Sequence, residues 1–372
     1  MLAKVNSYTD KTHIHIWVMC LLALISGHSA FPQADTVEKS SNSAVVIPLI
    51  FYKPETRWGV GVAGITAFRF RNEPDSSKES QVHLGLAYTQ ENQALFYMPY
   101  DVFFNNEKWR LYGELGYYKY FYRFFGIGNG VENDVGEPYK VNYPRLRITA
   151  LRQLSHGLYA GLRYWFEHYD IVELDSTGLL ISGDITGSEG GATSGLGANV
   201  VFDNRDMVFD PGRGWLVDAS VQWFGQMTGS DYAYAKYRLD ASRYVRTVRG
   251  QALAINAYVI LSSGNPPFNR LALLGGHQHL RGYYMGRYAD RQMWTTQVEY
   301  RIPLFWRIGI TGFGGCGMVA PALSGFKMNN MRYAGGGGIR FSLNKKDRIN
   351  IRLDAGFGKD THGYYLTIGE AF

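Results

Sequence analysis

Alternation of apolar and polar residues dominates the chain from Ala44 to its end. In the segment 348–357, apolar side chains at every odd position alternate with charged residues, asparagine or glycine. Segments 109–117 and 215–223 alternate in the same way. A period of two residues places the two sets on opposite faces of a β-strand. The pattern therefore predicts strands with one apolar face and one polar face.

The expected strands have nine or more residues, and many begin or end in Trp, Tyr or Phe. Strands of soluble sandwiches average about 5–6 residues, whereas a transmembrane strand needs about 9–11 and is flanked by interfacial aromatics. We therefore expect an all-β fold, a 16-stranded antiparallel transmembrane β-barrel whose polar face lines the lumen. The sixteen expected strands span 44–52, 56–71, 80–90, 93–104, 107–120, 143–154, 157–171, 193–204, 213–226, 231–247, 250–263, 290–302, 304–320, 330–343, 347–358 and 361–372.

Connection lengths agree with that strand count. The three longest expected connections, 121–142, 172–192 and 264–289, all follow odd-numbered strands, and most connections after even-numbered strands are short. Outer-membrane barrels have an even number of strands, short periplasmic turns and long external loops. We therefore expect both termini of the barrel on the periplasmic side.

The N-terminal segment has the layout of a targeting signal. Residues 1–34 contain two lysines and then an apolar stretch, 14–26, which is too short to span a bilayer, followed by small residues. This is typical of a secretory signal peptide. We expect 35–43 to be a short periplasmic segment and 44–372 to form the barrel. Only Cys316 lies outside the signal, so no intrachain disulfide is expected.

Composition excludes several other classes of protein. Aromatic residues make up 15% of the chain, charged residues 19%, and the mean hydropathy is −0.20. No apolar run reaches the roughly 20 residues of a membrane helix, and disorder and coiled coil are excluded as well. The formal net charge is +6, and no run of basic residues interleaved with aromatics occurs, so a nucleic-acid partner is not expected.

A first motif lies in the long connection after the eleventh expected strand. Residues 274–283 read LGGHQHLRGY and include Leu280, Arg281, Gly282 and Tyr283. A second motif lies between the eighth and ninth expected strands, where the chain reads DNRD and then PGRGW. Its candidate site residues are Asp203, Arg205, Asp206, Pro211, Arg213 and Gly214.

These two motifs, in this order and followed by a terminal Phe372, resemble those of the Omp85 superfamily, also called the bacterial surface antigen D15 family or BamA/TamA-like barrels. The resemblance covers about 47–372. It implies that the loop bearing Arg281 folds back into the lumen and docks on the inner wall. It also identifies the second motif as a periplasmic turn.

Strand parity supplies an acceptor for the arginine. Glu299 has lumenal parity in the twelfth expected strand, so it is the expected partner of Arg281, and a guanidinium holds a carboxylate with two charge-assisted bonds. In the family a second acceptor, an aspartate, lies on the next strand. Gly315 takes that position here, so we expect a latch that has lost one of its two acids. The alternative is that Arg281 is an ordinary solvated loop residue.

The last expected strand ends in an aromatic residue. Tyr364, Leu366, Ile368 and Phe372 stand at alternate positions, and this resembles the C-terminal signal by which the barrel-assembly machinery recognises outer-membrane barrels. Glu370 departs from the apolar pattern, and we expect it near the membrane boundary, where a carboxylate costs little. The alternative is an ordinary last strand.

Other chemistry has little support in the sequence. His277 and His279 lie two residues apart with no third ligand at metal-site spacing, so no metal and no cofactor are expected. Catalytic motifs of hydrolases and phosphate-binding loops are missing from 35–372. The glycine run 335–338 is interpreted as a closely packed strand.

The segment before the first expected strand is too short for a periplasmic POTRA domain, so the chain resembles short, barrel-only members of the superfamily. We expect a protein of the cell outer membrane, in contact with outer-membrane lipids that include lipopolysaccharide. Three functions are open. One is an accessory role in outer-membrane protein or lipid transport or assembly with a separate periplasmic or membrane partner. The others are a gated channel or structural barrel and, least favoured, an outer-membrane hydrolase.

Overall fold

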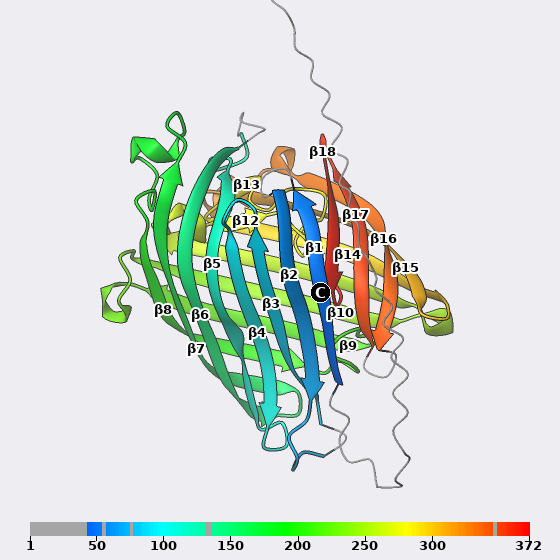
Figure 1. Cartoon of the computed structure of the whole chain (residues 1–372). Coiled ribbons are helices and arrows are strands. Elements are labelled where there is room, and N and C mark those ends of the chain that lie inside the picture. The colour runs from blue at the N-terminus through cyan, green and yellow to red at the C-terminus, as the bar shows by residue number, and fades with distance from the viewer. Residues whose placement is uncertain (1–42, 54–56, 75–76, 131–135, 345–347) are drawn as a thin grey trace, which may run out of the picture.

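The fold is all-β, and sixteen strands form one antiparallel sheet in which each strand pairs with the next (Figure 1). The computed structural model describes residues 43–53, 57–74, 77–130, 136–344 and 348–372. The expected signal peptide, and nearly all of the expected periplasmic segment, lie outside these residues. No helix in the described ranges is long and apolar enough to cross a bilayer.

The strands of the large sheet follow the predicted alternation closely. They are β1 Ser43–Lys53, β2 Arg57–Phe68, β3 Ser80–Thr89, β4 Ala94–Phe104, β5 Trp109–Phe124, β6 Glu137–Ser155, β7 Leu158–Leu174, β8 Gly191–Asp203, β9 Gly214–Phe224, β10 Tyr234–Arg246, β11 Ala252–Gly264, β14 Gln292–Phe305, β15 Ile308–Ala320, β16 Arg332–Asn344, β17 Ile349–Gly358 and β18 Thr361–Ile368. A two-stranded sheet, β12 Ala272–Leu274 and β13 Tyr288–Asp290, lies within the connection from β11 to β14. Short 3-10 helices are η1 Leu180–Ser182, η2 Gln226–Thr228, η3 Val248–Gly250, η4 Phe268–Arg270, η5 Leu323–Gly325 and η6 Met328–Asn330.

The sheet curls into a barrel (Figure 1). Val45 of β1 and Ile368 of β18 pack against one buried cluster that contains Ile65 and Ile349, so the first and last strands come together. Large apolar side chains remain exposed along the outward parity of the strands; Trp58, for example, is 56% exposed. Such an exterior is stable in lipid. The expected sixteen-stranded β-barrel is confirmed.

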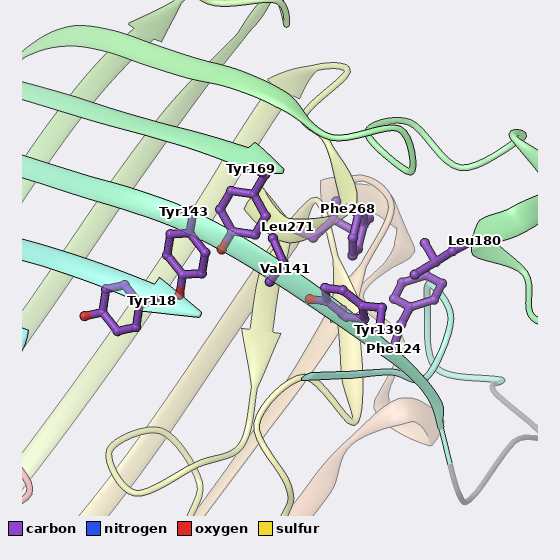
Figure 2. Close-up of a cluster of buried hydrophobic side chains, with 10 residues drawn as sticks. Tyr118, Phe124, Tyr139, Val141, Tyr143, Tyr169, Leu180, Phe268 and Leu271 are labelled. Atoms are coloured by element: carbon purple, nitrogen blue, oxygen red, sulfur yellow. The ribbon is translucent and has the colours of Figure 1, made fainter. Parts of the chain in front are cut away.

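The long connections gather at one end of the barrel. Leu180 of the β7–β8 connection packs against Phe124 and Tyr139, which flank the β5–β6 connection, and against Phe268 of the β11–β14 connection (Figure 2). The loop expected over 121–142 is shorter than predicted. Strand pairing continues there, with tyrosines on the inner face, so β5 and β6 extend beyond the part with clear alternation.

Stacked tyrosines line the inner wall below these loops. Tyr143 stacks between Tyr118 and Tyr169, with ring centroids 4.7 Å and 4.3 Å away (Figure 2). Phe268 and Leu271 of the β11–β14 connection belong to the same buried cluster. That connection is therefore held against the inner wall by aromatic packing as well as by the polar contacts described next.

Candidate functional site

The connection from β11 to β14 enters the lumen and carries Arg281 deep into it. Pairing of β12 with β13 makes the two halves of the connection run side by side. Leu280 and Tyr283, which flank the arginine motif, are each only 1% exposed. Leu280 packs with Met293 of β14 and Val319 of β15. The loop tip is therefore part of the folded interior.

Glycines let the loop backbone lie directly on the barrel wall. Gly282 has φ of +118°, which side chains disfavour, and a Cβ there would lie 2.8 Å from the carbonyl carbon of Phe357. Across the contact, a Cβ at Gly356 would lie 2.8 Å from the carbonyl carbon of Arg281. Tyr365 of β18 accepts a hydrogen bond of 2.9 Å from the Gly282 N–H. Motif and wall therefore fit only because both carry glycine.

The Arg281 guanidinium is fully buried between two carboxylates. Its Nη2 lies 2.6 Å from Glu299 Oε2 of β14, and its Nη1 lies 2.5 Å from Asp354 Oδ2 of β17. All three side chains have 0% exposure. The Phe313 ring of β15 lies 3.6 Å from the guanidinium carbon, close enough for a cation–π contact. Three strands thus hold one loop residue.

The second carboxylate corrects the expectation of a latch with one acid. Gly315 does occupy the position on β15, where an added Cβ would lie 2.6 Å from the Thr296 carbonyl oxygen. Asp354 lies on β17, two strands beyond β15, and its side chain reaches Arg281 by passing over Gly338 of β16. A Cβ at Gly338 would overlap Asp354 Oδ1. The lumenal parity of Asp354 and the glycine run beside it were the available signals. Neither signal shows how close Asp354 lies to the loop.

Further arginines complete an ion-pair network around this latch. Arg301 lies 2.8 Å from Glu299, and Arg340 lies 2.5 Å from Asp354 and 2.8 Å from Glu370. Arg352 donates to the carbonyl of His277 in the loop at 3.4 Å. The network contains four arginines, Arg281, Arg301, Arg340 and Arg352, and four carboxylates, Glu299, Asp354, Glu370 and Asp210 of the β8–β9 turn. Carboxylates engaged in this way act as anchors for the loop.

The turn motif lies at the opposite end of the barrel and organises its own backbone. Asp203 accepts two hydrogen bonds from Arg205, at 2.9 Å and 3.0 Å, and Lys78 from another turn lies 3.1 Å away. Asp206 accepts from the backbone N–H groups of Gly212 and Arg213, at 2.9 Å and 3.0 Å. These contacts fix the shape of the turn.

Arg301 and Glu299 of β14 connect the turn motif to the loop motif inside the barrel. Arg301 Nη1 lies 3.2 Å from Asp210 and 3.4 Å from the carbonyl oxygen of Pro211, both in the turn. Gly214 ends the turn with φ of +114°. Since Arg301 also holds Glu299, the turn at one end connects through two residues to the loop that enters from the other.

The C-terminal residues depart from the expected strand. Tyr364 and Leu366 face outward, at 53% and 44% exposure, but β18 ends at Ile368. Gly369, with φ of +87°, turns the chain inward, and the Phe372 carbonyl oxygen accepts from Arg301 at 3.1 Å. Our placement of Glu370 at the membrane boundary is therefore wrong, because Arg340 and Arg301 draw it into the lumen.

The two loop histidines are packed within the barrel. His279 stacks on Tyr258 with ring centroids 3.8 Å apart. Burial, with the nearby charges of Arg238 and His277, lowers the pKa of His279 to about 3. Within the described residues, no group of three or more His, Cys, Asp or Glu side chains has the arrangement of a metal site.

Comparisons with known proteins identify the family and the fold. A family model described as the Omp85 superfamily domain matches residues 72–372. BamA from Haemophilus ducreyi lacking POTRA domains 1-3 has a TM-score of 0.53 at 14% identity, covering 90% of this chain and 69% of that chain. CdiB from Acinetobacter baumannii has a TM-score of 0.55 at 10% identity, covering 89% of this chain and 60% of that chain. No curated protein matches. The structural likenesses show a shared fold.

Proposed function

The chain belongs to the Omp85 superfamily, and on that premise we propose that it has an accessory role in the assembly or transport of outer-membrane proteins or lipids. It works with a separate periplasmic or membrane partner. The barrel lies in the cell outer membrane, where lipids, including lipopolysaccharide, contact its apolar exterior. The barrel-assembly machinery inserts it there.

The observation that carries this proposal is the anchored loop within the lumen. Arg281 is held by Glu299 and Asp354 in a fully buried site, and Arg301 extends the same network to the opposite turn. Fully buried ion pairs of this kind favour one geometry, because releasing one partner strands a charge. A barrel with a loop anchored along its length is better suited to acting on clients at its wall than to free diffusion of solutes through its centre.

The exterior supports a location in a membrane. Trp215 and Trp223 lie at the two ends of β9, and both point outward, at 41% and 54% exposure. Leu239 of β10 and Val298 of β14 also face outward. Aromatic residues at strand ends with aliphatic residues between them match the girdles and apolar band of outer-membrane barrels.

Purification of the protein from native outer membranes tests the proposed role. The affinity tag belongs in the β9–β10 connection at Met227, which is fully exposed, because the C-terminus lies in the lumen. We expect reversible cross-linking to recover a specific protein partner, or bound lipid, that an equally abundant unrelated barrel does not recover. Loss of the protein should also lower the amount of at least one outer-membrane protein or lipid.

Two measurements separate the alternatives. Stepwise conductance of the purified wild-type barrel in planar bilayers, without a recovered partner, would instead favour the gated channel. Hydrolysis of outer-membrane lipids that disappears on substitution of a lumenal carboxylate would favour the hydrolase. If no partner or lipid is recovered and outer-membrane composition is unchanged without the protein, the accessory role is wrong.

A further inference from the structure

A second cluster of charged residues lines the lumen on β6, β7 and β10 and in the loop. Its cations surround the indole ring of Trp165. The guanidinium carbons of Arg147, Arg270 and Arg163 lie 3.5, 3.8 and 5.8 Å from the centre of that ring. Lys236 of β10 donates a hydrogen bond of 2.9 Å to the backbone carbonyl of Arg270. We call Arg147, Arg163, Lys236 and Arg270 the cationic site.

Unlike the latch network, the cationic site is not balanced by carboxylates. Glu167 lies 3.2 Å from Arg147 and 3.5 Å from Arg270, and it is shared with Arg145, at 2.5 Å. Glu114 pairs with Arg145 and Arg147 as well. The described residues place no carboxylate within 4.0 Å of Arg163 or Lys236. Three arginines therefore share two acids, and Arg163 and Lys236 add two positive charges beside them.

Two strands, β8 and β9, separate Arg163 from Lys236 on the inner wall. Arg163 Nη1 donates a hydrogen bond of 3.4 Å to Asn199 Oδ1. Cross-strand pairing sets Arg163 of β7 beside Gly197 of β8, Gly197 beside Gln222 of β9, and Gln222 beside Lys236 of β10. A Cβ at Gly197 would lie 2.7 Å from Gln222 Cγ, so the amide leans over β8 toward Arg163. Gln222 is 5% exposed, and its Nε2 has no hydrogen-bond partner.

Unpaired donors and excess positive charge in a confined space have a physical cost. A buried polar group without a partner loses its hydration, and like charges in a medium of low dielectric constant repel each other strongly. Lys236, Arg163 and Trp165 are only partly buried, so part of each side chain remains accessible from the lumen.

We infer that the cationic site binds an oxyanion of the phosphate type, held by Lys236, Arg163 and the Gln222 amide. A tetrahedral oxyanion of this type offers several acceptor oxygens and one or two negative charges, which matches separated donors from three strands. Arg147 and Arg270, stacked on Trp165, complete the positive wall. This inference goes beyond the proposed function and does not depend on it.

The wall next to the cationic site suits an amphiphilic ligand. Tyr97 of β4 is 38% exposed inside the barrel and lies across Gly116 from Arg145. Further along, small or aliphatic residues face the lumen, namely Leu49, Gly61, Ala63, Gly85, Ala87 and Leu95. The phosphate group can therefore come from a lipid headgroup as well as from free phosphate.

Binding at this site would also stabilise the docked loop. Arg270 belongs to η4, in the same connection that carries Arg281. A ligand that contacts Arg270 only when the loop is docked favours the docked state by mass action. Occupancy of the cationic site and protection of the loop are thus expected to rise together.

The first experiment follows the heat-induced gel shift of the barrel in detergent, in chloride buffer and with added inorganic phosphate. For wild type we expect phosphate to raise the midpoint temperature and to slow proteolysis of the loop. In Lys236→Gln this phosphate effect should fall at least tenfold in apparent affinity, while stability in chloride stays equal or rises, because a repelling charge is gone. A purely structural lysine would give lower stability in chloride and an intact phosphate effect.

Matched variants control for charge and folding. Lys140→Gln removes an exposed lysine paired with Glu173, at 2.7 Å, and should keep the full phosphate effect. Lys236→Arg keeps the positive charge and should keep most of the phosphate effect. Arg163→Gln should behave like Lys236→Gln. If Arg163→Gln fails to fold, the comparison of Lys236→Gln with Lys140→Gln is sufficient to test the inference.

The second arm replaces phosphate with phosphatidylglycerol in mixed micelles, against phosphatidylcholine alone. An effect of the lipid that is stronger than that of inorganic phosphate and is lost in Lys236→Gln identifies a lipid headgroup as the ligand. An effect of inorganic phosphate alone identifies the free ion. If neither raises the midpoint of wild type, or if Lys236→Gln and Lys140→Gln respond equally, the cationic site is not an oxyanion site.

Discussion

Arg281 and Asp354 are 73 residues apart in the sequence, yet the arginine Nη1 lies 2.5 Å from the aspartate Oδ2. Neither side chain is exposed. This pair joins the loop to β17, one strand before the end of the sheet, while Glu299 joins the same arginine to β14. The loop therefore ties together strands on both sides of the glycine-rich β15 and β16.

Removal of the latch arginine should release the loop. Arg281→Ala leaves Glu299 and Asp354 buried, although Arg301 and Arg340 still pair with them. We therefore expect a loss of about 2–4 kcal/mol, below that of an unrelieved buried charge. Arg281→Lys should restore part of this, because an ammonium cannot span both acids in the same way. Proteolysis of the loop and the gel-shift midpoint measure the effect.

A double-mutant cycle tests whether the latch partners act together. Arg281→Ala combined with Glu299→Gln should cost less than the sum of the two single changes, since each removes the same contact. Additive costs, or a loop that is equally accessible to protease in wild type and Arg281→Ala, would show that Arg281 does not anchor the loop.

The glycine run of β16 offers a matched pair of substitutions. Gly338→Ala places a methyl group against Asp354 Oδ1 and should displace the carboxylate, at a cost of about 1–3 kcal/mol, with release of the loop. Gly335→Ala meets its nearest atom, the Phe313 carbonyl oxygen, at 3.4 Å. It should change stability by less than about 0.5 kcal/mol. Equal loop protection in both variants would contradict the role given to Gly338.

The pH dependence of loop docking follows from His279. Burial lowers its pKa from 6.5 to about 3 in the docked loop. A released loop takes up a proton below pH 6.5 that the docked loop does not, so docking weakens as the pH falls from about 6.5 toward 3. The slope should approach about 1.4 kcal/mol per pH unit. His279→Gln should flatten the profile of loop proteolysis, and an unchanged profile would assign the acid sensitivity to other groups.

The C-terminal residue affects both assembly and the lumenal network. Deletion of Phe372 should lower the amount of assembled barrel in the membrane, because the terminal aromatic is the expected assembly signal and the Phe372 carbonyl also binds Arg301. Met227→Ala, at a fully exposed loop position, is the control. Wild-type levels of the truncated protein, measured in outer-membrane fractions, would argue against the assembly signal.

The sequence alone determined the number and order of the strands in the large sheet and most of their boundaries to within a few residues. Alternation with period two fixes which side chains face the lumen, and it requires no knowledge of distant contacts. For that reason Glu299 and Asp354 could both be assigned to the inner face. The arginine and turn motifs identified the family because each is a short run of residues between two strands, which can be read without knowledge of distant contacts.

The tertiary structure decided which lumenal residues meet. In a barrel, the alternation shows which face of the sheet a residue is on but not which residues it contacts, since a loop that enters the lumen can contact any strand. The pairing of Arg281 with Asp354 depends on the path of the loop and on the space that Gly338 leaves. The inward turn at Gly369, which brings Glu370 to Arg340, and the excess of cations around Trp165 have the same origin. Each of these features depends on residues from strands that are far apart in the chain. Only the assembly of those strands into one barrel brings the residues within a few ångströms of each other.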